Sequence, residues 1–313
     1  MTSSDAAIER VVATAADRIG DHPALAPILV GLPALLADLV DRWALTLGEV
    51  FDEGLGGPVL AVESKGRPAV LKIGRTGAAF AAQVGTMQAA GGRGYAVVLA
   101  ADVPRGAVLL ERLGPSLASA RLAPDEQVRH LTTALRQAWE VEPGGVPDLP
   151  HGGDKATELV GIVEQFRRTE DDERWGGALD RAVELGQHLA STRDLRRDVL
   201  CHGDPHSGNA LLSQGIPRYK LVDPDGFLCE PEYDVGVVLR DFSRELLGVG
   251  GPRRARELHA RLTRQAAEAT GTDAERVRQW AFVERVTTGL YLRWFEDTDT
   301  AQSFLDAAEL LLE

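Results

Sequence analysis

The side chains best suited to chemistry lie in one stretch of the chain, residues 201–225, which begins CHGDPHSGNALL. In it Asp204 is followed five residues later by Asn209, and an apolar run then leads to Asp223. A carboxylate near an acceptor hydroxyl can orient it and take its proton. An amide oxygen and a second carboxylate are hard ligands suited to Mg²⁺. These three groups are what phosphoryl transfer from a magnesium nucleotide requires.

The same stretch allows two other interpretations. His202, Asp204 and His206 alternate along the chain and could converge on a transition metal, as in a metallohydrolase. A turn stabilised by a local polar network would use the same residues without chemistry. The sequence around them has to separate these alternatives.

Two features nearer the amino terminus favour a nucleotide. A glycine-rich turn contains Gly54, Gly56 and Gly57, which would let the backbone approach a phosphate closely. Lys72 ends the apolar run PAVLKIG, where a phosphate contact and a solvated edge lysine are both possible. Either feature alone is as consistent with an ordinary hairpin.

The elements that must position these groups fall into two kinds. Residues 5–41 have helical periodicity, with breaks expected at Gly20 and at the Pro23/Pro27 pair. Five short β-type runs follow, LTLGEVF, PVLAVES, PAVLKIG, YAVVLA and GAVLLER, with one helix expected over Ala78–Ala90. Beyond residue 115 the patterns predict helices over 125–141, 154–170, 178–192, 233–247, 253–270, 274–294 and 301–312.

This layout predicts an α+β protein with a small, mostly antiparallel sheet followed by a larger helical part. The expected division is a helical segment 1–42, a β-rich lobe 43–113 and a helical lobe 114–313. No internal repeat interrupts this order.

Composition narrows the class of protein. The 313 residues carry 34 Lys+Arg and 47 Asp+Glu, a net charge of −13, which argues against nucleic acid or an anionic membrane as partner. Residues 1–115 account for −2 of that charge and the remainder for −11, which suits a cationic ligand of the helical lobe. Two cysteines, no secretory leader and no membrane-spanning run predict a cytoplasmic enzyme, and we expect a monomer.

The combined motifs resemble one known family. CHGDPHSGNALL followed by LVDPDGFLCEPEYDVGVVLRD is similar to the aminoglycoside/hydroxyurea antibiotic-resistance kinases, which include streptomycin phosphotransferases. The resemblance extends upstream through WALTL, PAVLK and LLERL and covers most of residues 43–245. It implies a protein-kinase-like bilobal fold, ATP or GTP and Mg²⁺ as cofactors, and phosphorylation of a hydroxyl group on a small, cationic antibiotic such as streptomycin.

The resemblance also implies roles for the reacting groups. Asp204 would be the catalytic base, Asn209 and Asp223 would hold Mg²⁺, and Lys72 would contact the α- and β-phosphates beneath the loop of residues 54–57. These roles come from the family and not from the spacing alone.

Further roles concern the frame of the site. Residues 109–113 would form the hinge between the lobes, with the backbones of Glu111 and Leu113 pairing to adenine. His202 and Asp234 would support the catalytic loop.

One position departs from the kinase pattern. The helix expected after Lys72 has no carboxylate, and Gln83 stands where a glutamate would pair with that lysine. A glutamine supplies no charge, so Lys72 would be held less firmly. A nucleotide-binding protein without catalysis therefore remains an alternative. A second alternative, within the enzyme class, is a metabolic kinase acting on a sugar or amino alcohol.

Acceptor contacts are expected in the helical lobe. Asp225 is the first candidate because it lies two residues after Asp223, and Glu230 is the second. Weaker candidates, for which a solvated surface or simple packing is the alternative, are Glu232, Glu296, Asp297, Asp299 and the aromatic residues Tyr291, Trp294 and Phe295.

Overall fold

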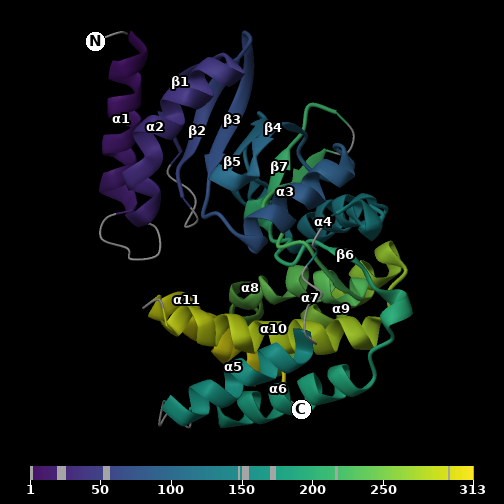
Figure 1. Cartoon of the computed structure of the whole chain (residues 1–313). Coiled ribbons are helices and arrows are strands. Elements are labelled where there is room, and N and C mark those ends of the chain that lie inside the picture. Colours follow the sequence, from purple (N-terminus) through teal and green to yellow (C-terminus); the bar gives the residue numbers. More distant parts are fainter. Residues whose placement is uncertain are drawn as a thin grey trace.

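The computed structural model describes residues 3–19, 26–51, 57–146, 149, 155–169, 174–215, 218–294 and 297–312. Figure 1 shows a twisted sheet and its helices on one side of the molecule and a stack of helices on the other. The segment that carries Asp204, Asn209 and Asp223 runs between these two parts.

A five-stranded antiparallel sheet has the strand order β1-β2-β3-β5-β4. Its strands are β1 (Leu45–Val50), β2 (Val59–Ser64), β3 (Arg67–Ile73), β4 (Val98–Asp102) and β5 (Ala107–Glu111). All five overlap the expected β-type runs. Lys72 of β3 lies opposite Val59 on one side and Val108 on the other. It therefore belongs to a central strand and is not an edge lysine.

One helix, α3 (Ala78–Ala90), joins β3 to β4, and it has the expected bounds. Gly91 ends it in the left-handed conformation (φ 57°), where its N–H closes on the carbonyls of Met87 and Gln88. The helix buries Phe80, Val84 and Met87 in the core beneath the sheet.

Two helices precede the sheet, α1 (Ser3–Ile19) and α2 (Ala26–Trp43). Leu32, Leu36 and Leu39 of α2 share one buried cluster with Leu60 and Leu71 of the sheet. The helical segment is therefore packed onto the sheet rather than standing apart (Figure 1).

The expectation of a break at Pro27 is wrong. Pro27 is the second residue of α2, where the backbone N–H has no partner within the helix, so proline is tolerated there. Gly20 and Pro23 lie outside the described residues.

The helical part contains eight described α-helices: α4 (Pro124–Ala138), α5 (Lys155–Thr169), α6 (Gly176–Ser191), α7 (Pro231–Arg240), α8 (Ser243–Gly248), α9 (Pro252–Thr270), α10 (Ala274–Trp294) and α11 (Thr298–Leu310). Short antiparallel pairs lie among them, β6 (Val199–Cys201) with β9 (Phe227–Cys229) and β7 (Ala210–Leu212) with β8 (Tyr219–Leu221). The 3₁₀ turns are η1 (Val103–Arg105), η2 (Leu117–Ala120), η3 (Pro143–Gly145), η4 (Leu195–Arg197) and η5 (Ser207–Asn209).

The helix expected over 233–247 is two helices in the structure. The Arg285 guanidinium donates to the carbonyl of Leu239 at 2.6 Å, and the Ser243 hydroxyl donates to the carbonyl of Arg240 at 2.8 Å. Because side chains take these carbonyls, the backbone turns at residues 241–242 and α8 starts afresh.

The expected α+β architecture is confirmed by the antiparallel sheet and the mainly helical remainder. One core cluster crosses the boundary, since Met87 and Leu110 pack with Val128, Leu200 and Leu221. The division into 1–42, 43–113 and 114–313 stays a prediction. Within the described residues no helix has both the length and the hydropathy needed to cross a bilayer.

Candidate active site

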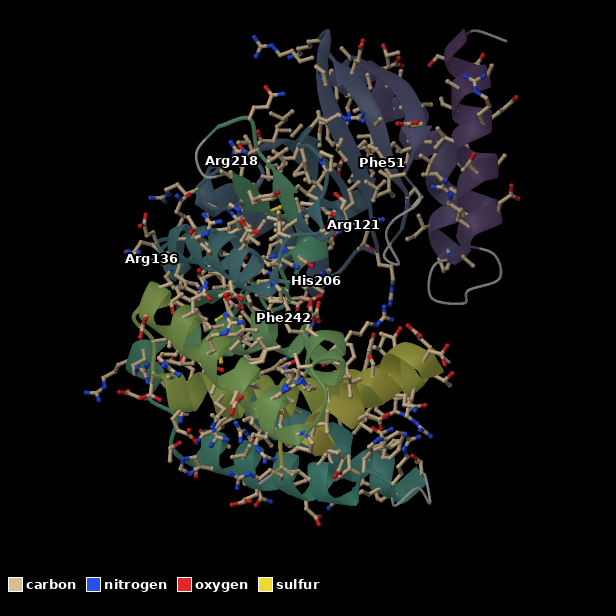
Figure 2. The ribbon with its side chains drawn as sticks, turned by 180° about the vertical axis from the view of Figure 1, so that it is seen from behind. Phe51, Arg121, Arg136, His206, Arg218 and Phe242 are labelled. Atoms are coloured by element: carbon tan, nitrogen blue, oxygen red, sulfur yellow. The ribbon has the colours of Figure 1, made fainter. Side chains whose placement is uncertain are left out.

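The loop expected to be catalytic, which we name the catalytic loop, runs from the end of β6 through η5 into β7, so the sheet-like pairs on either side fix its two ends. Figure 2 places His206 of this loop between the two parts of the molecule, above and to one side of Phe242. Asp204 follows Gly203, whose φ of 95° lies where glycine is favoured. A Cβ at Gly203 would lie 2.6 Å from an oxygen of Asp225, so only glycine lets these segments meet.

Asp234 holds the loop from below. Its carboxylate, fully buried in α7, accepts hydrogen bonds from the backbone N–H groups of His202 and Gly203 and from the indole of Trp139, each at 2.9 Å. Burial raises the pKa of Asp234, and these donors oppose that rise. The carboxylate predicted to support the loop therefore lies in contact with its backbone.

His202 uses both ring nitrogens within the protein. Nε2 lies 2.8 Å from the carbonyl of Val222 and Nδ1 accepts from the N–H of Asp204 at 3.1 Å. The ring also stacks on Tyr95, with centroids 5.8 Å apart. With both nitrogens engaged, His202 is not free to ligate a metal, which removes the main support for a metallohydrolase.

Asp204 lies between two donors. The guanidinium of Arg240 donates to its Oδ1, and Nε2 of His206 stands 3.5 Å from its Oδ2. Burial acts to raise the pKa of Asp204, but Arg240 and the two histidines outweigh it and hold the pKa below the usual value. The carboxylate is ionised at neutral pH, and the hydrogen bond from Arg240 falls on Oδ1 rather than on Oδ2.

Lys72 and Asp223 join the two parts of the molecule. The Lys72 ammonium lies 2.7 Å from Oδ1 of Asp223, with Lys72 mostly buried. Asp223 has a φ of 58°, a left-handed conformation that is uncommon for aspartate and aims its carboxylate back toward the sheet. Among the contacts of the described residues, Lys72 and Gln83 share no hydrogen bond.

Asn209 lies beside this pair. Its side-chain Nδ2 donates to the backbone carbonyl of Asp204 at 3.0 Å, and its backbone carbonyl accepts from the N–H of Val222 at 2.9 Å. Fixing the amide nitrogen in this way leaves Oδ1 free to act as a ligand. Asn209 and the part-exposed Asp223 together present hard oxygen donors, so the residues suit Mg²⁺.

The hinge is tied to the helical part by side chain and backbone. Oε1 of Glu111 accepts from the N–H of Val97 at 2.9 Å and from Lys220 at 2.6 Å. The backbone of Gly114 donates to Leu212 at 2.8 Å. Leu113, the other expected adenine contact, is half-buried between these anchors.

The glycine-rich turn is only partly described. Gly54 and Gly56 lie outside the described residues, while Gly57 has a φ of 133°. A Cβ there would lie 2.3 Å from the carbonyl of Ile73, so the end of the turn requires glycine where it meets β3.

Of the two acceptor candidates, only Asp225 faces the site. Its N–H donates to the carbonyl of His202 at 2.7 Å, and its carboxylate lies against Gly203. Burial and then the charge of Asp204 raise its pKa, although the side chain keeps contact with solvent, which limits that rise.

The prediction for Glu230 needs correction. Its carboxylate is 1% exposed and accepts from the indole of Trp280 and from the guanidinium of Arg276. A carboxylate with both oxygens engaged in the core is not available to a ligand. Glu230 instead joins the start of α7 to α10.

Of the weaker acceptor candidates that the structure describes, two are engaged in other contacts. Glu232 is buried against Arg197, and Asp297 caps α11 through the N–H of Thr300. Glu296 and Phe295 lie outside the described residues, whereas Tyr291 and Trp294 are exposed. Cys201 and Cys229 are buried free thiols, as expected of packed side chains.

Sequence reasoning missed the group behind Asp204. Arg240 of α7 also donates to Glu284 of α10 at 2.8 Å, and the Tyr233 hydroxyl donates to the other oxygen of Glu284 at 2.7 Å. These residues stand 36, 80 and 29 positions from Asp204 and share no spacing signal. The sequence signal that could have found this group is Arg240 itself, six residues after Asp234 on the same predicted helix.

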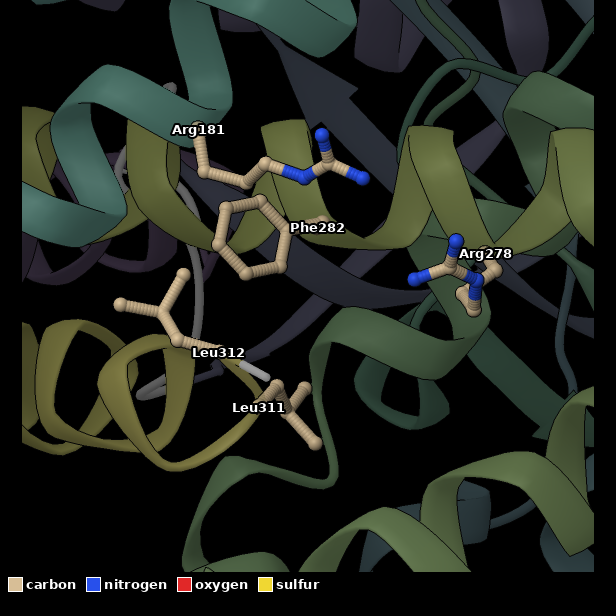
Figure 3. Close-up of a pocket in the computed structure, with 5 residues that line it drawn as sticks. All are labelled: Arg181, Arg278, Phe282, Leu311 and Leu312. Atoms are coloured by element: carbon tan, nitrogen blue, oxygen red, sulfur yellow. The ribbon is translucent and has the colours of Figure 1, made fainter.

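A hollow of about 390 Å³ lies elsewhere in the helical part, between α6, α10 and the end of α11. Figure 3 shows Arg181 and Arg278 at its rim with Phe282, Leu311 and Leu312. Its arginines form ion pairs with Glu184 and Glu275. No residue of the catalytic loop lines this hollow, so we do not connect it with the chemistry.

Comparison with known families gives one match over most of the chain. The sequence profile described as aminoglycoside/hydroxyurea antibiotic resistance kinase matches residues 42–298. Streptomycin 6-kinase of Streptomyces griseus is 26% identical over 230 residues, 72% of each chain. Streptomycin 6-kinase of Streptomyces glaucescens is 25% identical over 297 residues, 91% of this chain and 89% of that protein.

Solved structures agree in fold. An aminoglycoside phosphotransferase in ternary complex with ADP and hygromycin B superposes with a TM-score of 0.60 at 16% identity, over 88% of this chain and 98% of the other. A spectinomycin phosphotransferase in complex with ADP and spectinomycin gives a TM-score of 0.58 at 16% identity, over 89% and 98%. At such identities the likeness establishes the fold.

Proposed function

Because the chain belongs to the aminoglycoside/hydroxyurea antibiotic resistance kinase family, we propose that it transfers the γ-phosphoryl group of ATP or GTP to a hydroxyl group of a streptomycin-like aminoglycoside. Membership makes it a phosphotransferase, and the nucleotide and the acceptor are the proposed part. The observation that carries the proposal is the meeting of Asp204, Asn209, Asp223 and Lys72 where the two parts of the molecule join. The streptomycin 6-kinases among its relatives support the choice of acceptor.

The acceptor hydroxyl would donate a hydrogen bond to Oδ2 of Asp204, because Arg240 holds Oδ1. Its oxygen would then be aimed at the γ-phosphorus. The new O–P bond forms as the bond between the γ-phosphorus and the bridging oxygen of the nucleotide breaks. The hydroxyl proton passes to Asp204, and the nucleoside diphosphate leaves.

Lys72 would neutralise charge on the α- and β-phosphates. In this structure its ammonium pairs with Asp223 at 2.7 Å, so the two groups lie close enough to act on one nucleotide. Asn209 and Asp223 would hold Mg²⁺, which would neutralise the charge that builds on the transferring phosphates. Gln83 adds no charge to this arrangement, so it would not help to hold the Lys72 ammonium against the phosphates.

The acceptor would lie on the helical side of Asp204. Asp225 is exposed there, next to Gly203, and would attract an ammonium or guanidinium group of the antibiotic. The surplus negative charge of residues 116–313 acts in the same direction.

The test is a transfer assay with γ-labelled ATP or GTP, Mg²⁺ and a panel containing streptomycin, other aminoglycosides, hydroxyurea, choline and simple sugars. We expect streptomycin to gain one phosphoryl group, detected by mass, faster than any other acceptor. Transfer to a sugar or choline but to no antibiotic would overturn the proposed acceptor. Nucleotide binding without transfer to any acceptor would overturn catalysis.

A further inference from the structure

We propose that Arg240 is the positioning residue of the reaction, holding one oxygen of Asp204 so that the other faces the acceptor. The inference rests on the proposed function only in taking Asp204 as the group that receives the hydroxyl. Nothing in the motif of residues 201–225 contains it, since Arg240 lies at the end of α7, on the far side of the loop.

The guanidinium has one donor for each of three carboxylates. One terminal nitrogen donates to Oδ1 of Asp204, the other donates to Glu284 at 2.8 Å, and Nε lies 3.4 Å from Asp241. The side chain is only 12% exposed. A planar fork with fixed donor directions can hold two carboxylates at a set angle, which a lysine ammonium cannot do.

The far side of the fork is anchored in the core. Glu284 of α10 is 4% exposed and accepts the hydroxyl of Tyr233, which itself lies 3.3 Å from the carbonyl of Gly203. Burial raises the pKa of Tyr233, so the hydroxyl keeps its proton and remains a donor. Tyr233, Glu284 and Arg240 therefore connect Gly203 to Asp204 by contacts outside the loop.

This closed path gives the Asp204 carboxylate a hydrogen-bond partner from outside its own loop. Asp234 fixes the backbone of the loop, because its carboxylate accepts from two backbone N–H groups and from Trp139. The rotation of the Asp204 carboxylate is set by Arg240 on Oδ1, with His206 3.5 Å from Oδ2. Loss of the Arg240 fork should leave the loop in place and release the carboxylate.

The test compares Arg240→Lys with the wild type and with a matched control, Arg276→Lys. Arg276 is buried to the same degree, 11% exposed, and pairs with the buried Glu230 away from Asp204. Turnover is normalised to the number of nucleotide sites found by calorimetry, so that unfolded protein does not count. The crystal structure of Arg240→Lys supplies a readout independent of activity.

We expect Arg240→Lys to lower kcat per site by about 10- to 100-fold, as for other losses of orientation, with KM for nucleotide within about twofold. Arg276→Lys should lower the melting temperature and leave kcat per site unchanged. In Arg240→Ala, millimolar guanidinium or ethylguanidinium should restore part of kcat. The Asp204 carboxylate should rotate in the Arg240→Lys structure.

Three results would overturn the proposal: wild-type kcat per site in Arg240→Lys, an equal loss in Arg276→Lys, or an unmoved Asp204 carboxylate in the variant structure. Failure of the wild type to phosphorylate any acceptor would count against the proposed function instead. The rotation of Asp204 would still decide the role of Arg240 in that case.

Discussion

The two halves of the site are held in different ways. On the helical side Asp234, His202, Arg240, Glu284 and Tyr233 form buried contacts that reach the catalytic loop from several directions. On the sheet side Lys72 has, among the described residues, one ionic partner, Asp223, and that partner belongs to the other half. The acceptor half is therefore held by many buried contacts, whereas the nucleotide half is held by few.

The difference follows from where the charges lie. A buried carboxylate costs free energy unless hydrogen-bond donors surround it. Asp234 and Glu284 are buried, so the donors around them must keep fixed positions. Gln83 carries no charge and enforces no such order around Lys72. Each of the following changes tests one side of this contrast.

The largest effect on stability is expected for Asp234→Ala on the helical side. The change leaves the N–H groups of His202 and Gly203 and the indole of Trp139 without an acceptor, at about 1–3 kcal/mol each. We expect the free energy of unfolding to fall by about 3 kcal/mol, measured by urea denaturation. The exposed Asp180, changed to alanine, should alter it little. Equal stability of the two variants would show that the loop is not held in this way.

Lys72→Met tests the sheet side. Without its ammonium the nucleotide phosphates lose their protein-borne positive charge, so kcat/KM for nucleotide should fall by about 10- to 100-fold. Stability should hardly change, because within the described part of the chain the side chain has one ion pair to lose, with a part-exposed partner. The exposed Lys65, changed to methionine, is the control in steady-state kinetics. A Lys72→Met variant with much lower stability and an unchanged kcat/KM for nucleotide would reverse the contrast between the halves.

His259 gives the helical lobe an acid-sensitive group. Burial, with Arg285 nearby, lowers its pKa to about 3, whereas the unfolded chain has the ordinary value near 6.5. As pH falls below about 6.5 the unfolded state takes up a proton that the fold excludes. The free energy of unfolding should therefore drop by up to about 1.4 kcal/mol per pH unit until about pH 3.

Denaturation of His259→Gln between pH 7 and pH 5 measures this contribution. The variant should lose less stability over that interval than the wild type, while the surface change His188→Gln should follow the wild type. Identical pH slopes in all three proteins would contradict a buried neutral His259.

The smallest effect is expected for Gln83→Glu, which supplies the carboxylate that the kinase pattern pairs with the strand lysine. A carboxylate there could hold the ammonium when Asp223 turns to Mg²⁺, so we expect kcat/KM for nucleotide to rise about three- to tenfold. Gln88→Glu, on an exposed position of the same helix, is the control. A loss of activity in Gln83→Glu would show that the site is adapted to an uncharged partner.

The sequence predicted the parts of the site that lie close together along the chain. Asp204, Asn209 and Asp223 stand in one motif, and glycines and β-type runs located the sheet and Lys72. Arg240, Glu284 and the burial of Glu230 were not predictable, because they depend on how α7 and α10 pack. The turn at residues 241–242 was missed for the same reason, since Arg285 takes the carbonyl of Leu239 from another helix.

The most direct test of the account is phosphoryl transfer by Asp204→Asn beside the wild type, with streptomycin, Mg²⁺ and γ-labelled ATP or GTP. Asparagine keeps the shape of the side chain but cannot accept the proton, so transfer should fall by about 10²- to 10⁴-fold. Nucleotide affinity, measured by calorimetry, should stay within about threefold. Transfer at the wild-type rate by Asp204→Asn, with intact nucleotide binding, would contradict the central claim.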